Sequence, residues 1–171
     1  MKELCIILFV LYPFIIFGQS IQKDQVNRIE GYRVINTTSE NLDWSKPAHK
    51  VYGSVFINKA ADTTMSLLLY FKTPTVTTIF KGTKVILSLD DESELEFFHA
   101  GSDKNYGSND LAYAFITLDA QSAQILKNHS VVQYRVETNG VFVDVYIRKN
   151  SKDKISNIIK VLEESMRVPR T

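Results

Sequence analysis

Alternation of apolar and polar residues along the middle of the chain predicts a series of short β-strands. From position 51 the segment VYGSVFIN alternates between two faces, which is the period-two pattern of a half-buried strand. The next apolar segment, TMSLLLYFKT, is nearly apolar on both faces, as expected of a central strand, and Pro74 ends it. The segments VTTIF, TKVILSL, ELEFF and LAYAFITL continue the series, whereas residues 21–50 indicate one strand followed by a loop.

The clearest local signal is the segment VVQYRVET-NG-VFVDVYIR, which predicts a β-hairpin. An Asn-Gly pair between β-branched and aromatic runs favours a two-residue type I′ turn, here Asn139 and Gly140. Counting outward from this turn pairs Arg135 with Asp144 on one face, as a cross-strand ion pair of modest energetic value. The opposite face is expected to be buried. Its residues are Val132, Tyr134, Val136, Val143, Val145 and Ile147.

Two helices are predicted near the C-terminal end. The shorter one covers about residues 120–127 and follows Asp119, whose carboxylate is a suitable N-cap. The longer one begins near Ser151 and carries Asp153 in its first turn. Apolar residues at spacings of three and four give it one buried face. These residues are Ile155, Ile158, Ile159, Leu162 and Met166.

The order of these elements indicates the fold class. Strands and helices do not alternate regularly, so a parallel α/β sheet is not expected. The sequence predicts a mainly β (β-rich α+β) fold, with an antiparallel sheet of about seven strands arranged as a sandwich or partial barrel. The short helix near 120–127 and the C-terminal amphipathic helix complete it, and the latter is expected to pack on the sheet.

The first twenty residues, MKELCIILFVLYPFIIFGQS, have the layout of a signal peptide. Their apolar run is shorter than the ~20 residues that a membrane-spanning helix needs. We predict cleavage after Gly18 or Ser20, with an uncleaved anchor or a buried N-terminal helix as alternatives. Residues 21–171 then form a single β-rich domain of ordinary size, secreted or periplasmic, with no transmembrane span after signal removal.

Composition and motifs exclude several kinds of chemistry from the expected function. The single cysteine, Cys5, lies inside the predicted signal peptide, which argues against disulfides, cysteine-ligated zinc and a cysteine nucleophile. The net charge is +1 with both signs interspersed, so no nucleic-acid partner is predicted. The three histidines, His49, His99 and His129, do not form an H-E-x-x-H motif, and no G-x-S-x-G or phosphate-binding glycine motif occurs. We therefore predict no catalytic residues, no cofactor and no transition-metal site.

Two oxygen-rich stretches are candidates for a cation site. In SLDDESELEF, pairing Leu89 with Leu95 leaves 91–93 as the loop and places Asp90 opposite Glu94. This stretch is interpreted as a solvated hairpin tip, with a bound calcium ion as the alternative. The five acidic residues of this tip are Asp90, Asp91, Glu92, Glu94 and Glu96.

The second stretch, AGSDKNYGSND, resembles a calcium-binding loop only in part. Gly107 stands where the third side-chain ligand of the EF-hand pattern should be, so a flexible loop or plain connector is the favoured interpretation. If calcium binds at all, Asp103, Asn105 and Asp110 are the preferred ligands over the hairpin tip, because a loop can fold around an ion.

Aromatic residues on successive strands give the remaining indication of function. Their number exceeds what one sheet face can hide. They are Tyr52, Phe56, Tyr70, Phe71, Phe80, Phe97, Phe98, Tyr113, Phe115, Phe142 and Tyr146. Phe142 and Tyr146 fall opposite the apolar face of the final hairpin, where another layer covers them or they form a partner-binding surface.

The function expected from these observations is that of an exported non-catalytic binding module for an envelope or extracellular macromolecule. The alternative is a carrier that encloses a small apolar ligand in a barrel-like pocket lined by the aromatic residues. A hydrolase whose catalytic residues come together only in space is the least favoured interpretation.

Overall fold

The computed structural model describes residues 20–27, 30–43, 49–58, 60, 62–73, 79–101, 111–138 and 141–167. Residues 1–19 of the predicted signal peptide lie outside these ranges, as do the calcium candidates Asp103, Asn105 and Asp110 and the turn residues Asn139 and Gly140.

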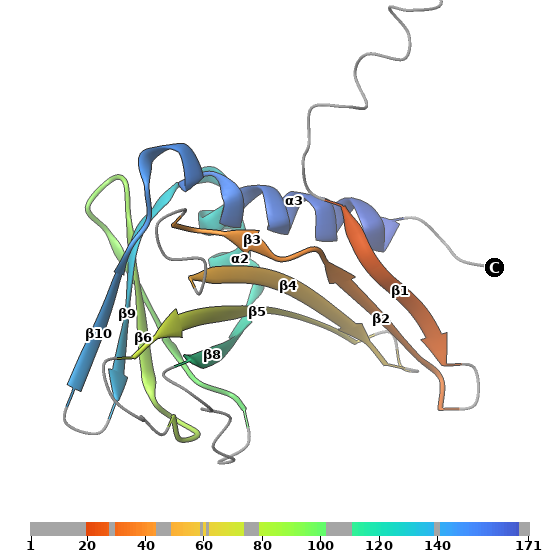
Figure 1. Ribbon diagram of the computed structural model, residues 1–171. Coiled ribbons are helices and arrows are strands. Elements are labelled where there is room, and N and C mark those ends of the chain that lie inside the picture. The colour runs from red at the N-terminus through yellow and green to blue at the C-terminus, as the bar shows by residue number, and fades with distance from the viewer. Residues whose placement is uncertain are drawn as a thin grey trace, which may run out of the picture.

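The described part of the chain forms two antiparallel sheets with two α-helices (Figure 1). The six-stranded sheet has the order β1-β2-β4-β5-β8, with β3 paired to β4, and the four-stranded sheet has the order β10-β9-β6-β7. The strands of the first are β1 (Ile21–Asn27), β2 (Tyr32–Thr37), β3 (Glu40–Asn41), β4 (Lys50–Ile57), β5 (Thr63–Lys72) and β8 (Leu111–Leu118). Those of the second are β6 (Lys84–Leu89), β7 (Glu94–Phe98), β9 (Val131–Thr138) and β10 (Val141–Tyr146).

The predicted fold class is confirmed, with more strands than expected. The structure is mainly β, both sheets are antiparallel, and they do not close into a barrel. The additional strands come from the N-terminal region, where β1, β2 and β3 replace the single strand expected in 21–50. Polar residues occupy most of the edge strand β1, so it lacks the alternation that marks a half-buried strand. Of the predicted strand VTTIF, residues 76–78 lie outside the described ranges, and residues 79–80 do not belong to a strand.

Helix α3 (Lys154–Arg167) packs on one face of the six-stranded sheet, over β2 and β4 (Figure 1). Its predicted apolar stripe is confirmed, since Ile155, Ile158, Ile159 and Leu162 are fully buried. A single 3₁₀ turn, Lys149–Ser151, precedes the helix, so the α-helix begins a few residues later than expected. Among the described residues, neither helix combines the length and apolar character needed to cross a membrane.

Helix α2 (Ala120–Asn128) begins at the predicted N-cap. The Asp119 carboxylate accepts a hydrogen bond of 2.7 Å from the backbone N–H of Ser122. This bond is the main reason why the pKa of Asp119 is lowered. Helix α2 also contacts α3, so the two helices and the inner faces of the sheets share one core.

The predicted register of the final hairpin is confirmed over β9 and β10. Val136 lies opposite Val143, and Arg135 lies opposite Asp144. The prediction that Val132 belongs to the buried face is wrong. Val131 is fully buried instead, and Val132 is partly exposed. The pairing of β9 with β6 shifts at this point, which moves the alternation of β9 by one residue.

The acidic hairpin is paired differently from the prediction. Leu95 lies opposite Leu87 instead of Leu89, a shift of two residues that leaves every side chain on its expected face. Residues 90–92 form the loop, so Asp90 does not face Glu94. Glu92 adopts a positive φ of 67°, as in three-residue hairpin loops that combine a type I turn with a left-handed residue.

Tyr134 connects the two sheets inside the core. Its side chain is fully buried on β9, and its hydroxyl donates a hydrogen bond of 2.7 Å to the backbone carbonyl of Tyr70 on β5. Its ring meets that of Phe71 edge-on, with 6.4 Å between the centroids. Burial raises the pKa of the Tyr134 phenol, which therefore remains a neutral hydrogen-bond donor.

Candidate functional site

A row of tyrosines crosses the face of the six-stranded sheet that is turned away from α3. Gly53 packs against α3, so strand alternation directs the adjacent Tyr52 to the opposite face. Tyr70 on β5 lies directly opposite Tyr113 on β8. The ring centroids are 5.9 Å apart for Tyr52 and Tyr70 and 5.7 Å apart for Tyr70 and Tyr113. Strand pairing thus holds three rings in a row, which we call the tyrosine row, with Tyr70 in contact with the ring on either side.

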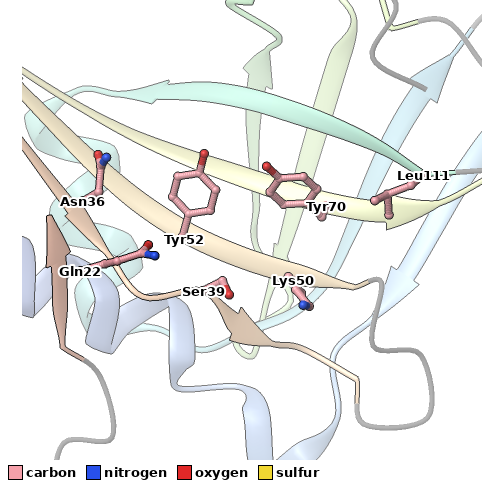
Figure 2. A pocket seen from close by; sticks show the side chains of 7 residues that line it. All are labelled: Gln22, Asn36, Ser39, Lys50, Tyr52, Tyr70 and Leu111. Atoms are coloured by element: carbon pink, nitrogen blue, oxygen red, sulfur yellow. The ribbon is translucent and has the colours of Figure 1, made fainter. Parts of the chain in front are cut away.

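A pocket of about 460 Å³ lies against two members of the tyrosine row (Figure 2). The residues that line this tyrosine pocket are Gln22, Asn36, Ser39, Lys50, Tyr52, Tyr70 and Leu111. The Ser54 hydroxyl donates a hydrogen bond of 2.7 Å to Oδ1 of Asn36, which orients the amide. Strands from β1 to β8 contribute, so the pocket extends across the width of the sheet.

The surroundings of the pocket alter the ionisation of the Tyr52 phenol. Burial raises its pKa to about 12, and electrostatic and hydrogen-bonding interactions with Tyr70 contribute further. Tyr52 is therefore a neutral phenol at physiological pH, with a hydroxyl that can donate and accept hydrogen bonds.

The lining residues offer the means of binding a polar ligand. The amides of Gln22 and Asn36 both donate and accept hydrogen bonds, and Lys50 supplies a positive charge. The tyrosine rings present apolar faces with a polar group at one end. Among these seven residues there is no carboxylate, imidazole or thiol that could act as general base or nucleophile.

A second hollow, of about 730 Å³, follows the β1–β2 hairpin. Its lining residues all belong to this hairpin, so it is the open side of a two-stranded ribbon rather than a pocket between elements. Asp24 lies at this hollow, and its carboxylate is engaged by the Arg33 guanidinium at 2.9 Å. We therefore treat the tyrosine pocket as the better candidate site.

The predicted partner-binding residues lie on the outer face of the four-stranded sheet. The side chains of Phe142 and Tyr146 are 65% and 69% exposed, so no described layer covers them. Arg135 forms two hydrogen bonds to Asp144, of 2.6 and 2.9 Å, and its guanidinium also lies 5.5 Å from the centre of the Phe142 ring. The predicted ion pair thus also orders one of the exposed aromatics.

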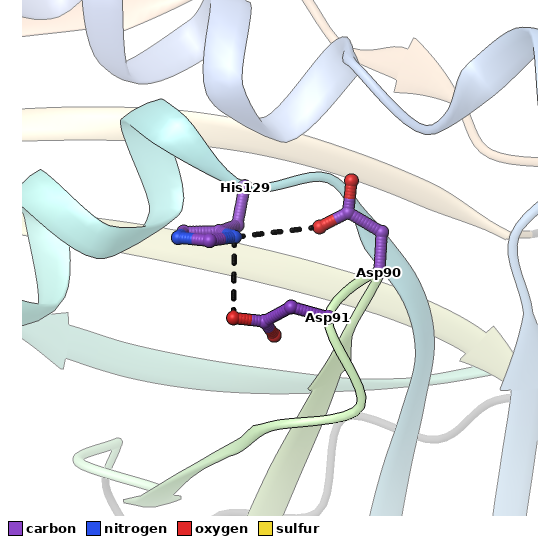
Figure 3. Close-up of side chains that lie close together, drawn as sticks. All are labelled: Asp90, Asp91 and His129. Atoms are coloured by element: carbon purple, nitrogen blue, oxygen red, sulfur yellow. Dashed lines mark ion pairs between the residues drawn. The ribbon is translucent and has the colours of Figure 1, made fainter.

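The acidic hairpin tip is joined by a histidine that the sequence did not connect with it (Figure 3). Nδ1 of His129 lies 3.5 Å from Oδ1 of Asp90 and 3.4 Å from Oδ2 of Asp91. We call these three residues the Asp90–Asp91–His129 cluster. Sequence spacing gave no signal for it, because pairing of β6 with β9 brings the two segments together.

The buried His99 has a structural role. Its Nδ1 accepts a hydrogen bond of 2.9 Å from the backbone N–H of Phe115 on β8. Its ring lies 6.3 Å from that of Tyr113, at the end of the tyrosine row. A side chain at Gly101 would collide with the imidazole, since a Cβ there would lie 2.5 Å from Nε2. His99 therefore ties the end of β7 to β8.

The tyrosine pocket combines residues from distant segments, so no local sequence pattern predicted it. Aromatic residues on successive strands, including Tyr52 and Tyr70, are visible in the sequence, but the strand order that places them in one row is a property of the tertiary structure. Comparison of the chain with protein-family models, with curated proteins and with solved structures finds no match in any of the three.

Proposed function

We propose that the chain is an exported, non-catalytic binding module that holds a carbohydrate component of the envelope or extracellular space in the tyrosine pocket. The observation that carries this proposal is the alignment of Tyr52 and Tyr70 beside polar side chains on one sheet face. Export is inferred from the signal-peptide layout of the first twenty residues.

The chemistry of the pocket matches that of a sugar ring. A pyranose has apolar C–H faces that pack on aromatic rings, and a rim of hydroxyls that both donate and accept hydrogen bonds. Tyr52 and Tyr70 supply the aromatic surface, and Gln22 and Asn36 supply amides with the same dual hydrogen-bonding capacity. Lys50 adds a positive charge, which favours a sugar that carries a carboxylate.

The extent of the pocket supports an elongated ligand. Its lining residues run from Gln22 on β1 to Leu111 on β8, which are the first and last strands of a five-strand path. Neighbouring strands are ~4.8 Å apart, so this path is roughly 19 Å wide. A short oligosaccharide spans such a width, whereas a single sugar ring does not.

The alternative of a carrier for a small apolar ligand has less support. Such a carrier needs an enclosed apolar cavity, typically inside a closed barrel. The two sheets do not form a closed barrel, and four of the seven lining residues, Gln22, Asn36, Ser39 and Lys50, are polar. Burying these groups against an apolar ligand without hydrogen bonds would be unfavourable.

Calorimetric titration with two soluble probes tests the proposal. Anionic peptidoglycan fragments are expected to bind more tightly than neutral N-acetylglucosamine oligomers of similar length, because only the former can pair with Lys50. Lys50→Gln should abolish this preference and retain binding of the neutral probe. Tyr70→Ala should lower the affinity for both probes at least about tenfold. This corresponds to a loss of ~1.4 kcal/mol in binding free energy from the missing ring contact.

The matched control is the double variant Phe142→Ala/Tyr146→Ala, which removes two exposed rings from the other sheet. It should bind both probes like the unmodified protein. The proposed site is wrong if this control loses binding as Tyr70→Ala does, or if neither probe binds at millimolar concentration. Recovery of the probes unchanged after long incubation is expected, and shorter products would contradict a non-catalytic role.

A further inference from the structure

We propose that Asp90, Asp91 and His129 form a binding site for a divalent transition-metal ion, for which Zn²⁺ is the best fit. The cluster lies on the four-stranded sheet side of the molecule, where the β6–β7 turn meets the end of α2 (Figure 3). It is separate from the tyrosine pocket and shares no residue with it.

The distances between the ligand atoms match those around a tetrahedral ion. Zn²⁺ binds imidazole nitrogen and carboxylate oxygen at 2.0–2.1 Å, so two ligands of a tetrahedral site lie about 3.4 Å apart. Nδ1 of His129 is 3.4 Å from Oδ2 of Asp91 and 3.5 Å from Oδ1 of Asp90. All three ligand atoms lie within 4.8 Å of one another. Small side-chain rotations therefore suffice to enclose an ion.

Neighbouring hydrogen bonds orient both carboxylates toward the imidazole. Oδ1 of Asp91 accepts hydrogen bonds from the backbone N–H and the hydroxyl of Ser93, while Oδ2 faces His129. Oδ1 of Asp90 accepts one from the backbone N–H of Ser130, at 3.2 Å. Such outer contacts fix the direction of metal ligands.

The two segments that carry the ligands are joined by regular structure. The backbone N–H of Asp90 donates to the carbonyl of Ser130 at 3.0 Å, next to the paired strands β6 and β9. The backbone N–H of His129 donates to the carbonyl of Ile125 and ends α2. The ligands therefore lie at the ends of a strand and a helix, which preserves their spacing.

The imidazole determines which ion is expected. Ca²⁺ takes six to eight oxygen ligands, whereas imidazole nitrogen suits zinc and neighbouring transition metals. A histidine with two carboxylates gives three protein ligands, which leaves a fourth position for water or for a group from a partner.

Histidine NMR and thermal unfolding of the untagged protein, with ZnCl₂ as the probe, test this site. The chain has three histidines, and His49 and His99 are buried, which makes the ring signals of His129 easy to distinguish. Zn²⁺ should shift the His129 ring signals and leave the other two unchanged. At a hundredfold excess over Kd the midpoint of unfolding should rise by about 5 °C or more, and CaCl₂ should produce no such rise.

Substitutions separate metal binding from simple ion pairing. Asp91→Asn and His129→Gln should each weaken Zn²⁺ binding at least about tenfold. The matched control is Glu92→Gln, which removes the same charge from the same turn and should change Zn²⁺ affinity less than about twofold. Unfolding without metal verifies that each variant is folded.

The proposal is overturned if millimolar Zn²⁺ neither shifts the His129 signals nor raises the unfolding midpoint of the unmodified protein. In that case the cluster is only an ion pair between a histidine and two aspartates. It is also overturned if Asp91→Asn and Glu92→Gln bind Zn²⁺ equally well.

Discussion

Replacing Gly53 with alanine is expected to destabilise the protein, because α3 crosses the sheet directly over this residue. A Cβ at Gly53 would lie 2.5 Å from Cγ2 of Ile158 and 2.6 Å from Cδ1 of Leu162. Favourable contacts between carbon atoms are about 3.5–4.0 Å, so the helix or these side chains must move by roughly 1 Å. Ile158 is β-branched and has one strongly preferred rotamer in a helix, so its Cγ2 cannot simply rotate away.

The magnitude follows from two opposing effects. In a strand with open space, alanine is more favourable than glycine by roughly 0.5–1 kcal/mol, because glycine loses more backbone entropy on folding. Overpacking a core costs about 1–3 kcal/mol. The net expectation is a loss of ~1–2 kcal/mol in the free energy of unfolding, or roughly 2–8 °C in the unfolding midpoint of a domain of this size.

Urea unfolding followed by circular dichroism measures this effect, and a double-mutant cycle with Ile158→Ala identifies its cause. Ile158→Ala alone should cost about 2–5 kcal/mol, since it leaves a cavity in the core. In the double variant the new methyl group at position 53 fills part of that cavity. The double variant should therefore be more stable than the sum of the single effects predicts, by ~1 kcal/mol or more. A stabilising Gly53→Ala substitution, or strict additivity in the cycle, would refute the packing of α3 on β4.

Three further predictions concern the core, the acidic turn and the tyrosine pocket. Tyr134→Phe removes the buried hydrogen bond to the carbonyl of Tyr70 and should cost about 1–2 kcal/mol in urea unfolding, whereas Tyr146→Phe, at an exposed position, should change nothing measurable. Glu92→Gly should raise the free energy of unfolding by roughly 0.5–1 kcal/mol, because glycine adopts the positive φ of 67° without strain; a loss of stability would contradict the turn geometry. Ultraviolet titration should assign a phenol pKa of about 12 to Tyr52, against 10.0 for an ordinary tyrosine. Because the folded-state pKa is raised, its stabilising contribution is complete below pH 10 and is lost as the pH rises to about 12, and Tyr52→Phe should remove this part of the pH dependence.

Local sequence signals were sufficient wherever the interacting residues are close in the chain. The Asn-Gly turn and the alternation around it predicted the pairing of Arg135 with Asp144, because a two-residue turn leaves one register for the strands that it joins. Asp119 predicted the start of α2 for the same reason, since an N-cap acts within one helical turn. The stripe of α3 also identified which residues would be buried.

The alternation of apolar and polar residues predicted which face of the sheet each side chain occupies, but not which residues pair across two strands. In the acidic hairpin the predicted and observed registers differ by two residues, and both place Leu87 and Leu95 on the buried side. The observed register requires a left-handed conformation at Glu92, and glutamate is not a residue type that signals such a turn in the sequence. In β9 the shift beside Leu89 likewise exchanged Val131 for Val132 in the core.

The tertiary structure decided which functional groups meet. Alternation assigned Tyr52 and Tyr70 each to one face of its own strand. Only the pairing of β4 with β5 brings the two rings together, with 5.9 Å between their centroids. Pairing of β6 with β9 brings Asp90 to His129 in the same way. The physical reason is that a period-two pattern states which side a residue faces and nothing about its neighbour across the strands. That neighbour depends on strand order and register, which the whole core selects together.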